Sequence, residues 1–175
     1  MEKELEVAKH ILERHREGIE KEEIRSLSRL RQVISPYSDY VSALKTKILE
    51  FLAPYNQEEK LLDAVRRVIS HISSIDVVEL PVQYSLSFEE MEELGAASRI
   101  DKALLATSLL RALGLEDAFC VIGNRYSLVK FNWLNRTYAI DIDRNELLEG
   151  ENAEEFIQNS QPRYVFNDLS FEFGE

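Results

Sequence analysis

Cleavage or transfer at an amide bond needs a nucleophile, a general base and a group that orients the base. The two candidate nucleophiles that we weigh are Cys120 in "AFCVIGN" and Ser98 in "GAASRID". Cys120 lies in a strand-like run, where a small buried residue is the usual assignment, and Ser98 precedes an apolar helix and suits an N-cap. All the histidines, His10, His15 and His71, fall in helical patterns of the first half of the chain. We therefore predict no Ser-His-Asp or Cys-His arrangement.

A second motif, "DIDRNELLEGEN", places four oxygen-bearing side chains at alternate positions, as the first part of an EF-hand calcium loop does: Asp141, Asp143, Asn145 and Glu149. The glycine of position six and the glutamate of position twelve are missing. A strand end followed by a polar turn is the simpler interpretation, so we expect no metal and no other cofactor, although cation binding by residues 141–145 stays an alternative. The sequence also contains no glycine-rich phosphate loop.

The order of motifs after residue 87 is more informative. A glycine precedes an apolar helix that ends in "LLRALG", and strand-like segments follow. This order resembles the core of the transglutaminase-like superfamily, which shares its fold with papain-type cysteine peptidases. Members typically read Gly-x-Gly-Asp-Cys-x-Asp-Lys-Ala, then Leu-Arg-Ala-x-Gly, His-x-Trp-Val-Glu-Val and Trp-x-x-x-Asp. The similarity covers about residues 55–145, and the residues in register are Gly95, Asp101, Lys102, Ala103, Leu110, Arg111, Ala112 and Gly114.

The resemblance assigns the three catalytic positions to Arg99, Tyr126 and Asp141, where the family has cysteine, histidine and an acid. Ser98 and Asp143 are the expected supporting residues. A guanidinium cannot attack a carbonyl, and a phenol with a pKa of about 10 is a poor general base. The resemblance therefore implies vestigial positions and no catalytic residue. We also predict that Arg99 turns toward Asp141 or Asp143 to form an ion pair covered by Tyr126.

The first half of the chain predicts helices that must be packed around this core. Apolar residues recur three or four apart, with a break at Gly18, an N-cap at Ser35 followed by Pro36, and another N-cap at Asn56. The predicted apolar stripes are Leu5, Ala8, Leu12 and His15; Ile24, Leu27, Leu30 and Ile34; Tyr40, Leu44, Ile48 and Phe51; and Leu62, Val65, Ile69 and Ile72.

The second half predicts a mixed pattern. "IDVVELPVQY" suggests an extended segment, and Ser87 with Glu90 suggests a capping box. The remaining expected elements are a buried helix over 98–113 ending at Gly114, strands near 117–123, 126–133 and 136–142 with a hairpin turn at Leu134-Asn135, a helix near 152–159 and a final strand in "RYVFNDLSFEF". We predict an α+β fold in which a buried helix packs on an antiparallel sheet. Residues 1–54 would form an N-terminal helical extension and residues 55–175 the transglutaminase-like domain.

Composition excludes several classes of function. The net charge is −11, and residues 51–175 carry the whole excess, so a basic face for nucleic acid is not expected. No apolar run approaches the ~20 residues of a membrane span, and the first residues lack a signal-peptide core. One cysteine excludes an internal disulfide. We expect a cytoplasmic protein.

Two functions from different classes follow. The first is a catalytically inactive transglutaminase-like domain that acts as a scaffold or binding module for a protein or peptide partner. Its charge-balanced N-terminal helices would then cover the domain or form the interface of a homo-oligomer. The alternative is a cysteine- or serine-dependent amidase or peptidase with a rearranged active site, in which Ser98 or Cys120 serves as nucleophile. The identity of the partner and the pathway cannot be predicted from the sequence.

Overall fold

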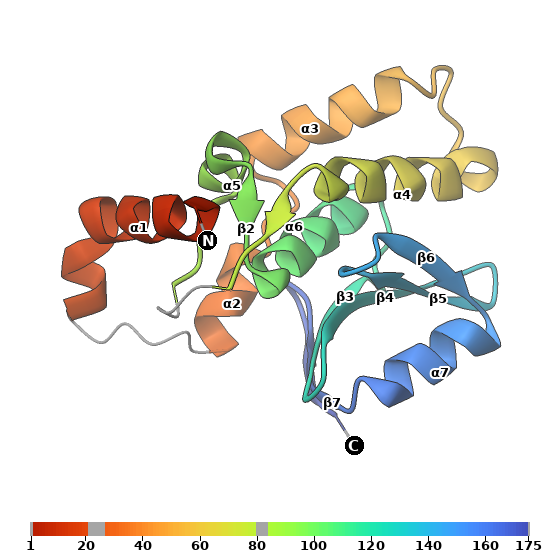
Figure 1. Ribbon diagram of the computed structural model, residues 1–175. Coiled ribbons are helices and arrows are strands. Elements are labelled where there is room, and N and C mark those ends of the chain that lie inside the picture. Colours follow the sequence, from red (N-terminus) through yellow and green to blue (C-terminus); the bar gives the residue numbers. More distant parts are fainter. Residues whose placement is uncertain (1, 21–26, 80–83, 175) are drawn as a thin grey trace.

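The computed structural model describes residues 2–20, 27–79 and 84–174 and has the predicted α+β architecture, with helices above and below an antiparallel sheet (Figure 1). The helices are α1 (Glu2–Glu20), α2 (Leu27–Val33), α3 (Asp39–Glu50), α4 (Gln57–Ser73), α5 (Phe88–Leu94), α6 (Arg99–Ala112) and α7 (Glu151–Asn159). The strands are β1 (Asp76–Val77), β2 (Ala96–Ala97), β3 (Phe119–Gly123), β4 (Ser127–Trp133), β5 (Arg136–Asp141), β6 (Glu146–Glu149), β7 (Pro162–Phe166) and β8 (Phe171–Phe173).

The main sheet has the strand order β6-β5-β4-β3-β7-β8, and every neighbouring pair is antiparallel. The short strands β1 and β2 form a separate parallel pair immediately before α6. The turn between β4 and β5 is the predicted two-residue connection. Leu134 and Asn135 both have positive φ, 49° and 60°, as the hairpin turn whose twist matches that of the strands requires.

Helix α6 is the centre of the fold. It packs against α3 and α4 on one side and against β3 and β4 on the other, and every residue from 101 to 111 is buried. Two buried hydroxyls, those of Thr107 and Ser108, are satisfied by carbonyl oxygens one turn earlier in the same helix. The predicted burial of this helix against an antiparallel sheet is confirmed, and so is its end, because Gly114 has a φ of 94°.

Helix α7 covers the opposite face of the sheet (Figure 1). Ala153 of α7 packs against strand residues that alternate with those facing α6: Val121, Leu128, Ala139 and Val165. Because successive side chains of a strand point to opposite faces, each strand residue can be assigned either to the α6 face or to the α7 face. This assignment decides which side chains can meet at the start of α6.

The N-terminal helices differ from the sequence prediction in their buried faces. In α1, Val7 and Ile11 are buried, whereas Leu5 and Leu12 are 57% and 50% exposed. The interruption of α1 lies at His15, which has a φ of −123° and a ψ of 15°, and not at Gly18. The predicted stripe was wrong at Leu5 and Leu12, whereas its other members, Ala8 and His15, are partly buried; a count of apolar residues also misses the partly buried His10.

Several boundaries are also corrected. The N-cap of α3 is Ser38, whose Oγ accepts the Val41 N–H, and not Ser35. Phe51, assigned to the apolar stripe of α3, is 71% exposed. The single final strand is a hairpin of two strands, β7 and β8, because Asn167 binds the backbone N–H groups of the next residues in a turn. The prediction at Ile24 and part of the expected extended segment, residues 80–83, lie outside the described residues.

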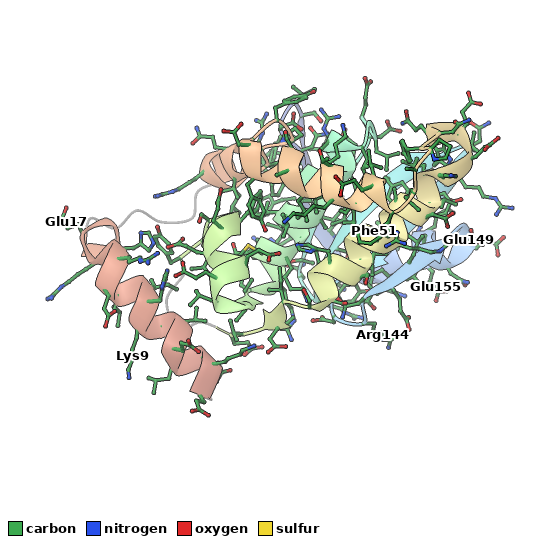
Figure 2. The ribbon with its side chains drawn as sticks, turned by 90° about the horizontal axis from the view of Figure 1, so that it is seen from above. Lys9, Glu17, Phe51, Arg144, Glu149 and Glu155 are labelled. Atoms are coloured by element: carbon green, nitrogen blue, oxygen red, sulfur yellow. The ribbon has the colours of Figure 1, made fainter. Side chains whose placement is uncertain are left out.

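Figure 2 shows α1, which carries Lys9 and Glu17, at one end of the molecule, while Arg144, Glu149 and Glu155 lie at the other. Phe51 lies near the second end, where its ring stacks under the Arg67 guanidinium 4.6 Å from the ring centroid. Within the described ranges, no helix combines the length and the apolar character that crossing a membrane requires.

Candidate functional site

The start of α6 is a capped helix N-terminus. Ser98 Oγ accepts the Asp101 backbone N–H at 3.2 Å and also lies 2.7 Å from Asp101 Oδ2, to which it donates. Asp101 is only 1% exposed. The predicted N-cap role of Ser98 is therefore confirmed, and its hydroxyl proton is directed toward a buried carboxylate at the same helix end.

Arg99 follows the cap and lies at the surface, with a side chain that is 41% exposed. Its Nε donates to Asp143 Oδ1 at 2.6 Å, and its Nη1 donates to Glu79 Oε1 at 3.0 Å. The bond to Asp143 raises the pKa of Arg99 further above its ordinary value. The expected turn of Arg99 toward Asp143 is confirmed. A cation in the first turn of a helix meets the positive end of the helix dipole, and the two carboxylates offset that cost.

Tyr126 and Asp141 lie on the α7 face of the sheet, away from Arg99. The Tyr126 hydroxyl donates to the Phe156 carbonyl at 2.8 Å, and the two rings stack with centroids 4.7 Å apart. Burial, and then the Asp141 charge, raise the pKa of Tyr126. The expectation that Tyr126 covers the Arg99 ion pair is wrong, because the Tyr126 ring packs against Phe156 of α7 on the other face of the sheet.

Asp141 stabilises the turn that follows β5. It is the register partner of Leu128 on β4, which belongs to the α7-side cluster. Its Oδ1 accepts the backbone N–H groups of Asp143 and Arg144 at 2.9 and 3.0 Å, which stabilises the turn between β5 and β6. The turn that resembled an EF-hand loop is thus a hairpin connection, in which Asp141 binds backbone and Asp143 binds Arg99.

The strand residues that do face the start of α6 are apolar or uncharged. Ser127 is the register partner of Ile122, which packs against the core cluster that contains α6. Ile142 directly follows β5, is 1% exposed and belongs to the same cluster. A shift of one residue exchanges the faces of a strand, so a motif position alone does not determine which residues face α6.

Cys120 lies in β3 on the α6 face and is completely buried. Burial raises the pKa of its thiol far above the ordinary range, and the negative charge of Asp101 adds to this shift. A reactive cysteine needs the opposite conditions, a lowered pKa and access to solvent. The thiol therefore has the properties of a packing residue.

Lys102 was recognised only as a residue in register with a motif, and its environment was not predicted. It is 1% exposed, and its Nζ donates to the Ile75 carbonyl at 2.9 Å. Burial lowers its pKa, and the charges of Asp143 and Asp76 oppose that effect. A helix with apolar residues on all sides gives no sign in the sequence that one of its lysines is enclosed.

The histidines make their ion-pair contacts with α5 and not with the start of α6. His71 in α4 has its Nε2 2.6 Å from Glu92 Oε1. His10 and His15 in α1 both direct Nε2 at one oxygen of Glu90 in α5, at 3.0 and 2.7 Å. Burial of Glu90 raises its pKa, but its contacts with His15, the Ser87 backbone N–H and His10 outweigh this and lower the pKa to about 2. This cluster was not predicted, because its members are far apart in the sequence.

The described elements form an α+β fold in which the buried helix α6 packs on an antiparallel sheet. The chain matches no protein-family model and no curated protein sequence. Among solved structures it is similar to Legionella pneumophila LapG, with a TM-score of 0.53 and 14% sequence identity over 87% of this chain and 91% of that chain. At this identity the similarity shows the fold alone, and it supports the fold expected from the motifs.

Proposed function

We propose that this chain is a catalytically inactive transglutaminase-like domain that binds a protein or peptide segment. The observation that supports it best is the start of α6, where the family has its nucleophile. Arg99 occupies this position and forms ion pairs with Asp143 and Glu79. A permanently protonated group that is already bonded to two carboxylates has neither the electron pair nor the freedom to act as a nucleophile.

The faces of the strands refine the proposed vestigial positions. We infer that Arg99 takes the cysteine position and that Ser127 and Ile142 suit the histidine and acid positions better than Tyr126 and Asp141 do. In the Trp-x-x-x-Asp pattern, Tyr138 at the tryptophan position places the acid at residue 142. Ser127 and Ile142 lie on the face that α6 covers. Neither can serve as a general base, which strengthens the proposal of an inactive domain.

The alternative, a rearranged amidase or peptidase, is not favoured. Cys120 is enclosed and its thiol is held in the protonated form by burial. Ser98 has its hydroxyl bonded to Asp101, and a carboxylate without an imidazole does not reproduce the usual activation of serine. In the described part of the chain, the histidines belong to α1 and α4 and not to the elements around Ser98.

A hollow beside the core supports the binding role. It measures about 880 Å³ and lies between α1, α2 and α5. Its lining combines charged, hydroxyl and aromatic side chains, among them Arg14, Arg29, Tyr84 and Phe88. Side chains of these types suit an extended segment of another protein, because they offer both apolar contact area and hydrogen bonds.

Thiol labelling tests the inactive state. We expect native protein to react with iodoacetamide much more slowly than protein unfolded in urea, because Cys120 is buried. Transamidation and peptidase assays on native protein should show no turnover. The Cys120→Ser variant should have the same fold and should also show no turnover in these assays. Turnover that disappears in folded Cys120→Ser would refute the proposal.

Copurification from the source organism tests the binding role. A partner that uses the hollow should be retained by wild type and lost with Tyr84→Ala. Leu169→Ser is the matched control, because Leu169 is 75% exposed in the β7–β8 connection and lies outside the hollow. Equal retention by both variants would show that the partner binds elsewhere.

A further inference from the structure

Three side chains that could ligate a metal converge where α1 meets α5. His10 Nε2 and His15 Nε2 lie 3.0 and 2.7 Å from the same atom, Glu90 Oε1, and the three ligand atoms all lie within 4.8 Å of one another. The side chains are mostly enclosed, with exposed fractions of 13%, 27% and 11%. Within the described residues, no other group of three such side chains is so close together.

The local backbone creates this convergence. Residues five apart in a regular α-helix do not share a face, since each residue turns the helix by ~100°. The non-helical φ and ψ at His15 interrupt α1 and bring the two imidazoles onto one side. The arrangement thus depends on a specific distortion, which is often found where a protein positions functional side chains.

Neighbouring contacts hold two of the three groups in orientation. Glu90 Oε2 accepts the Ser87 backbone N–H at 2.9 Å within the capping box of α5, which leaves Oε1 directed at the imidazoles. The His15 ring stacks on Tyr84 with centroids 4.4 Å apart. The ligands of a metal site are usually held in orientation by contacts with neighbouring residues of this kind. Here they are present before any ion binds.

The distances suit a small divalent ion. Zinc is bound by histidine nitrogen and carboxylate oxygen at ~2.0–2.1 Å, which separates the ligand atoms of a tetrahedral site by ~3.3 Å. The observed nitrogen-to-oxygen distances of 3.0 and 2.7 Å are those of hydrogen bonds, so the side chains must separate by a few tenths of an ångström to admit the ion. Two histidines and one carboxylate also form the ligand set of zinc and ferrous sites that keep open positions. His15 and Glu90 line the hollow of about 880 Å³, so water can reach those positions.

We propose that His10, His15 and Glu90 form a binding site for one divalent transition-metal ion of the zinc class. In the ion-free form, each imidazole that donates to Glu90 carries its proton on Nε2. Binding of the ion requires that this proton move to Nδ1 or to solvent, so that the Nε2 lone pair faces the metal. The nearby Arg14 guanidinium lies 3.5 Å from Glu93, which partly neutralises it. This inference does not rest on the proposed function, although the site opens into the same hollow and shares the contact between His15 and Tyr84.

Titration of the untagged full chain with Co²⁺ and Zn²⁺ tests the site. We expect one equivalent of Co²⁺ to produce visible absorption bands and Zn²⁺ to displace it. Loss of a residue that only orients a metal ligand typically weakens metal affinity ~10–100-fold. We expect a larger loss of affinity when a ligand itself is replaced, in His10→Ala, His15→Phe and Glu90→Gln. Phenylalanine keeps the stack on Tyr84, and glutamine can keep the capping box, so loss of binding would not reflect loss of the local structure.

His71→Ala is the matched control, because His71 also lies beside a glutamate but has no second imidazole with it. Its affinity for the ion should equal that of wild type. Histidine side-chain NMR of the wild type provides a measurement that needs no variant: Zn²⁺ should shift the Nε2 signals of two histidines and leave the third unchanged. The absence of a one-to-one complex, or equal binding by wild type and His10→Ala, would refute the site.

Discussion

We expect the ion pair between Arg111 and Asp168 to contribute more to the free energy of unfolding than the ion pair at Arg99 does. Arg111 Nε and Nη2 donate to the two oxygens of Asp168 at 2.7 and 3.3 Å, and Nη1 donates to the Glu116 carbonyl at 2.6 Å. The two side chains are 5% and 15% exposed. This arrangement connects the end of α6 to the β7–β8 connection.

Substitution of Arg111 by methionine would leave the Asp168 carboxylate without its Arg111 donors and the Glu116 carbonyl with the longer hydrogen bond from Asn167 Nδ2, at 3.4 Å. Breaking a buried ion pair from one side costs about 3–5 kcal/mol, and the partial exposure of Asp168 points to the lower limit. Arg99→Met removes a pair whose members are 41% and 43% exposed, so we expect a cost of about 1 kcal/mol or less. At ~2–4 °C per kcal/mol for a chain of this size, Arg111→Met should lower Tm by ~6–12 °C.

Urea unfolding followed by circular dichroism measures both variants under the same conditions. The free energies of unfolding should differ by about 2 kcal/mol or more, with similar dependence on urea concentration. Addition of Asp168→Asn to Arg111→Met should recover part of the loss, because no charge is then stranded. If Arg111→Met is destabilised no more than Arg99→Met, burial and bidentate geometry do not determine the strength of these pairs, and the reasoning fails.

Two further predictions concern Lys102 and the β4–β5 turn. Because burial lowers the pKa of Lys102 below its ordinary 10.5, the unfolded chain binds its proton more readily, so wild-type stability should rise as pH increases through the interval between the two pKa values. Lys102→Met should lose that rise in urea unfolding at pH 7 to 10, and identical slopes would contradict it. Leu134→Asn with Asn135→Gly should raise the free energy of unfolding by about 1 kcal/mol, since both positions have positive φ. No gain in thermal unfolding would mean that the turn is not strained.

Much of the fold could be predicted from local signals. The run of apolar residues before Gly114 predicted a buried helix because few polar side chains interrupt it. The hairpin at Leu134 and Asn135 could be predicted because a two-residue connection between two strand-like runs is typical of a β-hairpin. The capping box of Ser87 and Glu90 was also found, since its spacing is fixed by helix geometry.

The site was less predictable, because it depends on facts that are not local. Tyr126 was assigned to a motif position, but the register of β4 puts its ring against α7. The cluster at Glu90 requires a distortion at His15 and the packing of α1 against α5. Neither feature produces a periodic pattern in the sequence from which it could be predicted. Arg99 was predicted to meet one of two acids, and only the hairpin geometry at Asp141 decides that Asp143 is the partner.

The alternation of faces in β4 and β5 limits how this scaffold could gain catalysis during evolution or by design. A thiol at position 99 with an imidazole at position 126 would place the two groups on opposite sides of a sheet, where no side-chain movement could bring them together. Under the assignment proposed above, substitutions at Arg99, Ser127 and Ile142 would place all three groups on one side of the sheet. The proposed function thus predicts that this chain and an active relative differ at these positions in their side chains and not in the faces of their strands.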